Sequence, residues 1–495
     1  MELRETKNLT AGAKTLLVLV FAIMTGFMWR VRGDHGWGSM WGMFAVGVML
    51  VLAIFAFYGN RRKMSYEAIP VAVILLGITN GGWGTLNSQM GGYLGSTVPF
   101  TGEEVDRVVA ISPYSGLWVM LLLGFGWMPL FALYIGSLFS KKNYKIKDYI
   151  ILVAIFYVVV YAFQFFAAHY ILPFIHGEAV EYFKQGLADR GIEMSPMMAY
   201  IKNLGSEAWF KKIPFGRNYF ASIRVISYSA AALIVSFAAL IAKKDRVTFF
   251  ISTAINAVSA LAITLADVFL IIDSDAGFLG KVTPPSFLKD GSWSLWEYFT
   301  GFLLGFGIML IVAFLPKSIS AGEGKFEYDE PFRNKKLHGA YSAVMTLFCT
   351  FVVTVARPLG MRIAQMFVDG GKIEEEEPLS YIITAVVCVA GLAVCAAIAK
   401  KNITDRGLAV PVPMRTDEFC MKAAPLYFLV TGIMYFFTGN AYIIKLPFAQ
   451  MKNPSSLIEM IRDGSLVMTG LMIISFILFY IFFFAAEKSV KKSRK

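Results

Sequence analysis

The chain consists largely of long apolar stretches separated by short polar segments. Most stretches are close to about 20 residues, the length that an α-helix needs to cross the hydrocarbon of a bilayer. They are centred near Val20, Val48, Ile74, Gly124, Val158, Leu233, Leu261, Leu304, Phe348, Val387, Tyr435 and Ile474. The pattern predicts an all-α polytopic membrane protein with about 12 transmembrane helices, and this even number places both chain ends on one side.

Composition narrows the class of protein further. Hydrophobic residues make up 57% of the 495 residues, charged residues make up 16%, and the mean hydropathy is +0.60. A soluble protein of this length has too little interior to bury so many apolar side chains. The composition therefore excludes a soluble globular protein.

The distribution of basic residues predicts the orientation. If successive polar segments lie on alternate sides, 28 of the 46 Lys and Arg residues lie on the side of the N-terminus. Because positive residues favour the cytoplasm, we predict a multi-pass protein of the plasma (inner) membrane with both termini cytoplasmic. The net charge of +12 then reflects orientation and contact with anionic membrane lipids. We expect no nucleic-acid partner.

The two halves of the chain carry similar short polar motifs in the same order. The matched pairs are Ser39-Met40-Trp41 with Ser294-Leu295-Trp296, Gly84 and Gln89 with Gly360 and Gln365, Pro113-Tyr114-Ser115 with Pro378-Leu379-Ser380, and Tyr170-Ile171 with Tyr442-Ile443. We therefore predict an internal repeat of two tandem six-helix bundles, residues 1–245 and 246–495. Because each unit has an even number of helices, the two units have a parallel orientation.

This predicted layout resembles the major facilitator architecture. The resemblance is to the layout alone, because the connection between the halves, near Lys243 to Arg246, is very short. The segment Gly59-Asn60-Arg61-Arg62-Lys63 also departs from the loop motif of that family. The resemblance implies two bundles related by an axis along the membrane normal.

Candidate binding residues gather at the outer ends of several predicted helices, two of which end in glycine-rich segments. A broken helix leaves backbone groups unpaired, which hydrocarbon permits only where the break lines a polar cavity or is covered by protein. Arginine adds a planar fork that suits carboxylate or phosphate. The candidates for binding the substrate are Arg30, Arg32, Asp34, His35, Trp37, Asn80, Trp83, Asn87, Gln89, Arg357 and Gln365. The alternative is a set of tight outer turns with interfacial Trp anchors and snorkelling Arg side chains.

A second set of residues is expected to act in gating or in coupling. Asp273 and Asp275 follow the seventh apolar stretch. If they align with Arg30 and Arg32 in the repeat, opposite charges would face each other across an outer gate. Acidic side chains in a dry cavity, Asp34 among them, are also candidates for coupling to H+ or Na+. The gate or coupling set is Asp267, Asp273, Asp275, Glu297, His169 and Asn440. Otherwise the aspartates are solvated loop residues and the histidine lies at a capped helix end.

The long outer segment from Pro173 to Asn218 contains two amphipathic stretches, Glu178 to Leu187 and Met197 to Trp209. We expect these stretches either to lie on the membrane surface or to cover the outer mouth as a lid. The counterpart of this segment in the second half, from Pro447 to Gly464, is shorter.

The leading functional prediction is a secondary active transporter, in which the two bundles alternate access to a small polar or anionic solute. No Gly-Lys-Ser/Thr nucleotide-binding loop is present, so ATP is not expected to drive transport within this chain. No metal or other cofactor is expected, because the cysteines have neither CxxC nor metal-ligand spacing. They are Cys349, Cys388, Cys395 and Cys420.

The alternative prediction is an outward-facing membrane transferase or hydrolase that acts on a lipid-linked or phosphorylated substrate. In that enzyme Asp34 and His35 would be acid and base, and Arg30, Arg32 and Arg357 would hold phosphate. A non-catalytic receptor or assembly component is the third class considered.

Overall fold

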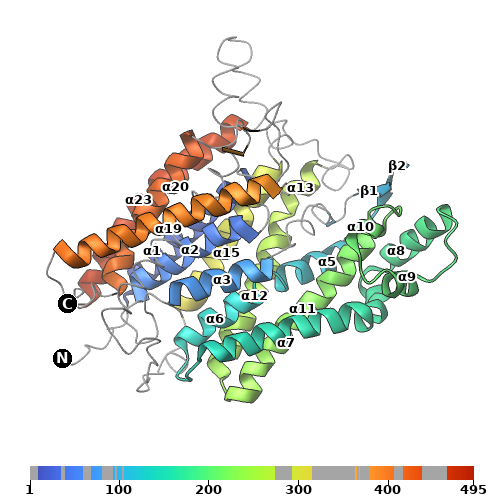
Figure 1. The fold of residues 1–495 in the computed structure, drawn as a ribbon, viewed down its shortest axis with the longest axis horizontal. Coiled ribbons are helices and arrows are strands. Elements are labelled where there is room, and N and C mark those ends of the chain that lie inside the picture. The colour runs from blue at the N-terminus through green and yellow to red at the C-terminus, as the bar shows by residue number, and fades with distance from the viewer. Residues whose placement is uncertain are drawn as a thin grey trace, which may run out of the picture.

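The computed structural model describes residues 9–34, 40–58, 68–80, 93–94, 97–102, 105–273, 292–314, 363–364, 367, 378–405, 416–437 and 465–494. These residues form a helical protein with one short hairpin of strands (Figure 1). The elements are α1 (Ala11–Asp34), α2 (Met40–Tyr58), α3 (Ala68–Asn80), β1 (Thr97–Gly102), β2 (Val105–Ala110), α5 (Pro113–Phe125), α6 (Pro129–Phe139), α7 (Ile146–Phe165), α8 (Ala167–Asp189), α9 (Pro196–Lys202), α10 (Glu207–Phe210), α11 (Gly216–Lys243), α12 (Arg246–Ala266), α13 (Val268–Asp273), α15 (Ser292–Ala313), α19 (Pro378–Asp405), α20 (Thr416–Phe437) and α23 (Ser465–Arg494).

Helices lie at eleven of the twelve predicted centres, and the remaining centre, Phe348, lies outside the described residues. Six described helices are long and apolar enough to cross a membrane, and a seventh span results if α5 and α6 count as one. Helices are the expected form, because hydrocarbon offers no partner to backbone groups and a helix bonds them internally. The described residues therefore suggest a multi-pass membrane protein, and the number of twelve spans stays a prediction.

The fourth predicted span is not a single helix. It is broken between α5 and α6, whose axes differ in direction by 52°. Pro129 begins α6 and has no N–H, so it cannot donate to the carbonyl of Phe125, where α5 ends. Gly126 lies between them and allows close approach of the neighbouring helix α11. The apolar stretch predicted a membrane-spanning segment here, but it did not predict the bend.

The structure also contains a hairpin that the apolar pattern did not predict. Strands β1 and β2 pair antiparallel, from Thr97 opposite Ala110 to Gly102 opposite Val105. Both strands lie in the polar segment between the third and fourth predicted spans. The prediction of helices is therefore confirmed for the described apolar stretches, and among the described residues this segment is the exception.

The chain reverses sharply between the predicted halves. Lys244 has a left-handed backbone (φ 50°) directly after α11, and Asp245 caps the start of α12. The Asp245 carboxylate accepts the N–H groups of Val247 and Thr248 at 3.1 Å each. An oxygen acceptor at this position satisfies backbone donors that a helix start leaves open, so two long helices can follow each other closely.

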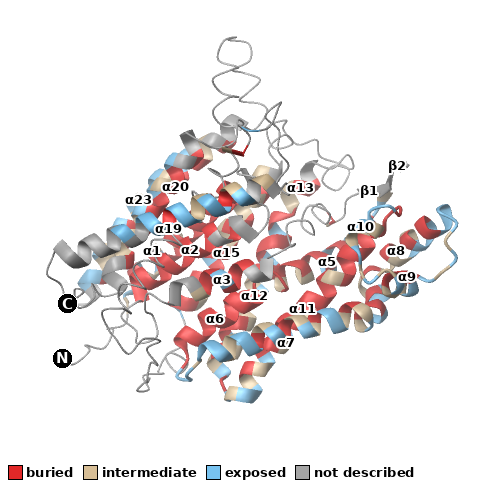
Figure 2. Ribbon diagram, viewed as in Figure 1, coloured by how far each residue is buried: buried red, intermediate tan, exposed pale blue. Residues whose placement is uncertain are grey.

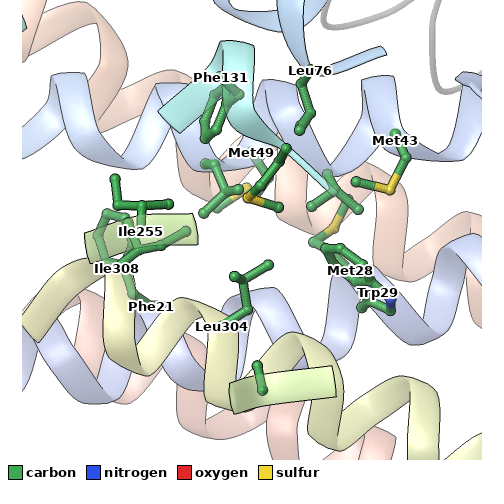
Figure 3. Close-up of a cluster of buried hydrophobic side chains, with 14 of the residues drawn as sticks. Phe21, Met28, Trp29, Met43, Met49, Leu76, Phe131, Ile255, Leu304 and Ile308 are labelled. Atoms are coloured by element: carbon green, nitrogen blue, oxygen red, sulfur yellow. The ribbon is translucent and has the colours of Figure 1, made fainter. Parts of the chain in front are cut away.

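Helices from both predicted halves share one core. Helix α1 packs along α15 and α23, α2 packs on α20, and α12 packs on α5, α6 and α15. In Figure 3, Phe21 of α1, Phe131 of α6 and Ile255 of α12 lie in the same buried cluster as Leu304 and Ile308 of α15. These contacts cross the predicted boundary between residues 245 and 246, and the division into bundles 1–245 and 246–495 stays a prediction.

Several helices carry exposed positions, drawn pale blue on α7, α19 and α23 in Figure 2, and many of these positions are apolar. Examples are Val158 on α7, Val389 on α19 and Ile481 on α23. Apolar surfaces of this extent are unusual on soluble proteins and are expected where lipid covers them.

The segment between α7 and α11 forms a compact unit with a small core of its own. Helix α8 follows α7 after a kink at Phe166, and α9 and α10 return the chain to α11. Phe183 of α8, Tyr200 of α9, Phe210 of α10 and Tyr219 of α11 are all buried in this core. The two predicted amphipathic stretches therefore bury their apolar residues against α11, and a lid role stays a prediction.

Candidate functional site

Helices α1 and α15 lie in close contact because small residues line their interface. A Cβ atom at Gly301 of α15 would overlap the carbonyl oxygen of Thr25, and one at Gly305 would overlap that of Phe21. On α1, Gly26 faces Tyr298 in the same way, with the Tyr298 carbonyl oxygen 3.1 Å from the Cβ position. Small residues four positions apart are a common device for close helix packing in membranes.

The two helices run antiparallel, and their polar ends therefore meet. At one end the Lys14 ammonium lies 5.1 Å from the centroid of the Phe314 ring. At the other end Arg30 Nη1 donates to Glu297 Oε2 at 2.5 Å, and Arg32 Nη2 lies 3.5 Å from Glu297 Oε1. The close backbone packing thus brings two arginines of α1 to one glutamate of α15.

This cluster, which we name the Arg30–Arg32–Glu297 cluster, is largely removed from solvent. Arg30 and Glu297 side chains are each 14% exposed and that of Arg32 is 5% exposed. Charges at such sites are costly unless paired, which explains why both carboxylate oxygens face a guanidinium group. Two guanidinium groups and one carboxylate leave a net positive charge on the three side chains.

Aromatic contacts connect the cluster to the break between α5 and α6. The Arg32 guanidinium lies 5.3 Å from the centroid of the Trp29 ring. Trp29 in turn meets Trp127 edge to face, with 4.8 Å between ring centroids, and Trp127 lies in the break itself. Both indoles are buried. These contacts form a packed connection between the Arg30–Arg32–Glu297 cluster and the break between α5 and α6.

The structure groups the predicted residues differently from the sequence. Arg30 and Arg32 were paired with Asp273 and Asp275, whereas their described partner is Glu297. Asp273 ends α13 with no described side chain, and Asp275 lies outside the described residues. The sequence did place Arg30 and Glu297 at a similar depth in the membrane. Arg30 ends one predicted span, and Glu297 begins another at the same membrane face.

Many other candidates are not placed. Asp34 and Asn80 end α1 and α3, and their side chains are not described. The candidates outside the described residues are His35, Trp37, Trp83, Asn87, Gln89, Arg357, Gln365 and Asn440. Their roles stay predictions.

Asp267 occupies a structural position at the end of α12. Its side chain is fully buried, and Oδ2 accepts the N–H of Leu94 at 3.1 Å. The adjacent Tyr93 hydroxyl accepts from Asn218 Nδ2 of α11 at 2.7 Å. Asp267 thus holds the segment that precedes the hairpin against the helical core, and its predicted role in coupling stays a prediction.

Sequence reasoning missed a polar group beside Tyr93. The His176 ring packs edge to face on Tyr93, and His176 Nδ1 lies 3.3 Å from Glu178 Oε2. The Glu178 Oε1 atom accepts the N–H of Ser112, which caps α5. Hydrogen bonding from His176 and the serines outweighs the opposing effect of burial and lowers the pKa of Glu178 to about 2. The only sequence signal was the start of an amphipathic stretch at Glu178.

His169 lies at the start of α8, beyond the spanning helix α7. Its buried ring forms a 2.7 Å hydrogen bond through Nδ1 with the Tyr219 hydroxyl. Burial lowers the pKa of His169 to about 4, although a hydrogen bond with the Gln164 backbone acts in the opposite direction. The ring is therefore neutral near pH 7.

This neutral histidine predicts a specific pH dependence of stability. An unfolded histidine has a pKa near 6.5, so the unfolded state binds a proton first as the pH falls. The free energy of unfolding should therefore decrease by up to about 1.4 kcal/mol per pH unit between about pH 6.5 and 4, and then level off. His169→Gln should remove this component, which thermal unfolding of both proteins at pH 7.5 and 4.5 would measure. An equal loss in the variant would contradict the assignment.

Within the described part of the chain, no group of three or more His, Cys, Asp or Glu residues is arranged to hold a metal ion. Among the described residues, the thiol of Cys388 is free. No family model, no curated protein and no solved structure matches the chain. Functional inference therefore rests on the geometry of the site.

Proposed function

We propose that the protein is a secondary active transporter for a small polar or anionic solute. The observation that carries the proposal is the Arg30–Arg32–Glu297 cluster, which joins α1 to α15 at the ends of two apolar helices. Ionisable side chains within membrane-spanning segments commonly mark solute pathways or gates, because an unpaired charge there is expensive. A purely structural contact between two apolar helices would not require three charges.

The two arginines of the cluster favour an anionic group on the solute. A carboxylate or phosphate could replace Glu297 as the partner of one arginine, since guanidinium presents paired donors that match such groups. Exchange of partners would break a link between α1 and α15 when the solute binds. Such an exchange supplies the differential contacts that a two-state transport cycle needs.

The remaining features of the proposal follow the sequence. The protein would be a plasma-membrane protein with cytoplasmic termini, about twelve helices and two repeated six-helix bundles, in a layout like that of major facilitators. Glu297 and Asp267 are the described carboxylates that could couple transport to H+ or Na+, because both are largely or fully buried. Membrane lipids would cover the apolar faces of α7, α19 and α23.

A ligand screen by thermal stability tests the proposal. The purified protein would be heated with soluble anionic metabolites and sugars in one panel, and with polyprenyl-linked or phospholipid-linked compounds in the other. A ligand at about 100 times its dissociation constant should stabilise by about 2.7 kcal/mol. We expect a soluble hit whose effect disappears in Arg30→Gln and Arg32→Gln, followed by uptake of that compound into liposomes.

Arg224→Gln is the matched control for this screen. Arg224 also belongs to an apolar helix, but its Nη2 donates to Tyr228 of the same helix at 3.0 Å. Its replacement should leave the ligand effect intact. Stabilisation by lipid-linked compounds alone would replace the transporter with an outward-facing membrane enzyme.

A further inference from the structure

Asn256 of α12 lies between the contacts that this helix makes with α5 and with α6. Helix α12 runs alongside this pair, with Ala260 against Gly124 of α5 and Thr248 against Gly136 of α6. Asn256 lies between Thr248 and Ala260 in sequence, as the break lies between Gly124 and Gly136. Asn256 also shares the helix face of Thr248 and Ala260, since all are multiples of four residues apart.

The side-chain amide of Asn256 is fully buried, yet it forms no hydrogen bond with the described residues. Among the described residues, neither Oδ1 nor Nδ2 of Asn256 has a hydrogen-bond partner. The same holds within the described chain for the hydroxyl of Ser259, one turn further along, which is 2% exposed. Buried polar groups are nearly always satisfied, because leaving them unpaired is costly. Asn256 and Ser259 lie one turn apart on α12, so one ligand group between them would pair with both side chains.

The break interrupts the backbone hydrogen bonds of a continuous helix. Pro129 has no N–H, so it cannot donate to the carbonyl of Phe125. A serine of α11 stabilises the other end of the turn, since Ser229 Oγ donates to the Leu122 carbonyl at 2.6 Å. Discontinuous helices at mid-membrane are a recurrent way to build solute sites in transporters.

The ligand group at this position should be uncharged. Helices α5 and α6, and α12 from Thr248 to Ala266, contain no Asp, Glu, Lys, Arg or His. A charge held there would lack a counter-ion from these helices, which is costly in the middle of a membrane. An amide offers both donors and an acceptor, and a serine hydroxyl offers one of each. A hydroxyl or carboxamide group matches this combination.

We propose that Asn256 and Ser259, at the break between α5 and α6, form a mid-membrane binding site for an uncharged hydroxyl or carboxamide group of the transported solute. The inference rests on the proposed transport function, in which the anionic group binds at the Arg30–Arg32–Glu297 cluster. Trp29 and Trp127 connect the two positions. The solute therefore carries one charged group and one neutral hydrogen-bonding group.

Cysteine labelling tests the site without knowledge of the solute. In a background with the native cysteines replaced by alanine, Asn256→Cys and Ser259→Cys would be treated with a small charged methanethiosulfonate reagent in membranes. Both positions should react at least about tenfold faster than the control, because only a thiol that water reaches forms the reactive thiolate. The control is Ser227→Cys, a fully buried position whose hydroxyl already donates to Ile223 of its own helix at 2.9 Å. Equal rates at all three positions would overturn the proposal.

A stability measurement provides an independent test. Asn256→Leu keeps a similar volume and removes the unpartnered amide, so the Tm of the ligand-free protein should rise by a few degrees. In the same variant, the stabilisation by any soluble hit that carries a hydroxyl or carboxamide should be lost. A lower Tm would show that the amide has a structural role, and the proposal would be wrong.

The two proposals fail in different ways. Reactive cysteines and a raised Tm without uptake of any compound into liposomes would leave the site and remove the transport function. Uptake that depends on Arg30 but is unchanged in Asn256→Leu would leave the transport function and remove the mid-membrane site.

Discussion

Replacing Glu297 with alanine should destabilise the protein by about 3 kcal/mol, because removal of one partner leaves buried charge uncompensated. Arg30 and Arg32 both face this carboxylate, and their side chains are 14% and 5% exposed. Chemical unfolding of the detergent-purified protein would measure the loss. The exposed pair of Lys184 and Glu181 is the control, and Glu181→Ala should change the unfolding free energy by less than about 0.5 kcal/mol.

Charge exchange tests whether the effect comes from the pair itself. Arg30→Glu alone should be as harmful as Glu297→Ala, because two carboxylates would then lie together. The double variant Arg30→Glu with Glu297→Arg restores opposite charges at a 2.5 Å contact and should recover part of the stability and of ligand binding. A double variant no better than the worse single variant would rule out a functional pair of Arg30 and Glu297 and, with it, the exchange of partners proposed for solute binding.

Replacing Gly305 with leucine should also cost about 3 kcal/mol or more, because added atoms cannot fit in the interface between α1 and α15. Even a Cβ atom at Gly305 would overlap the Phe21 carbonyl oxygen, and backbone does not move aside as a flexible side chain does. Unfolding measurements with and without the soluble ligand would show a loss of stability together with a loss of binding. The second effect is expected because this packing sets the register of the arginines and Glu297.

Gly470→Leu is the matched control for Gly305→Leu. Gly470 lies in α23 and nothing is within 4 Å of its Cβ position, so the same side chain has room there. Its replacement should be neutral within about 0.5 kcal/mol. Similar destabilisation in both variants would mean that helix content, rather than packing of α1 on α15, determines the result.

The sequence by itself determined where the helices lie. Apolar runs near 20 residues, such as those centred at Val20 and Leu304, coincide with α1 and α15, because hydrocarbon forces backbone groups to bond within their own segment. This requirement acts within each segment, so a helix can be predicted without knowing which other segments pack against it. It also predicted Arg30, Arg32 and Glu297 as site residues, since charge at the end of an apolar run is visible in one dimension.

Only the tertiary structure decided which of these residues meet. Arg30 and Glu297 are 267 residues apart, and their contact depends on glycines that allow α1 and α15 to approach with one particular register. The packing of α12, which carries Asn256, on the bent pair α5 and α6 depends likewise on contacts between distant segments. A single asparagine in an apolar helix forms no recognisable sequence pattern. Its proposed role depends on the broken helix that packs beside it.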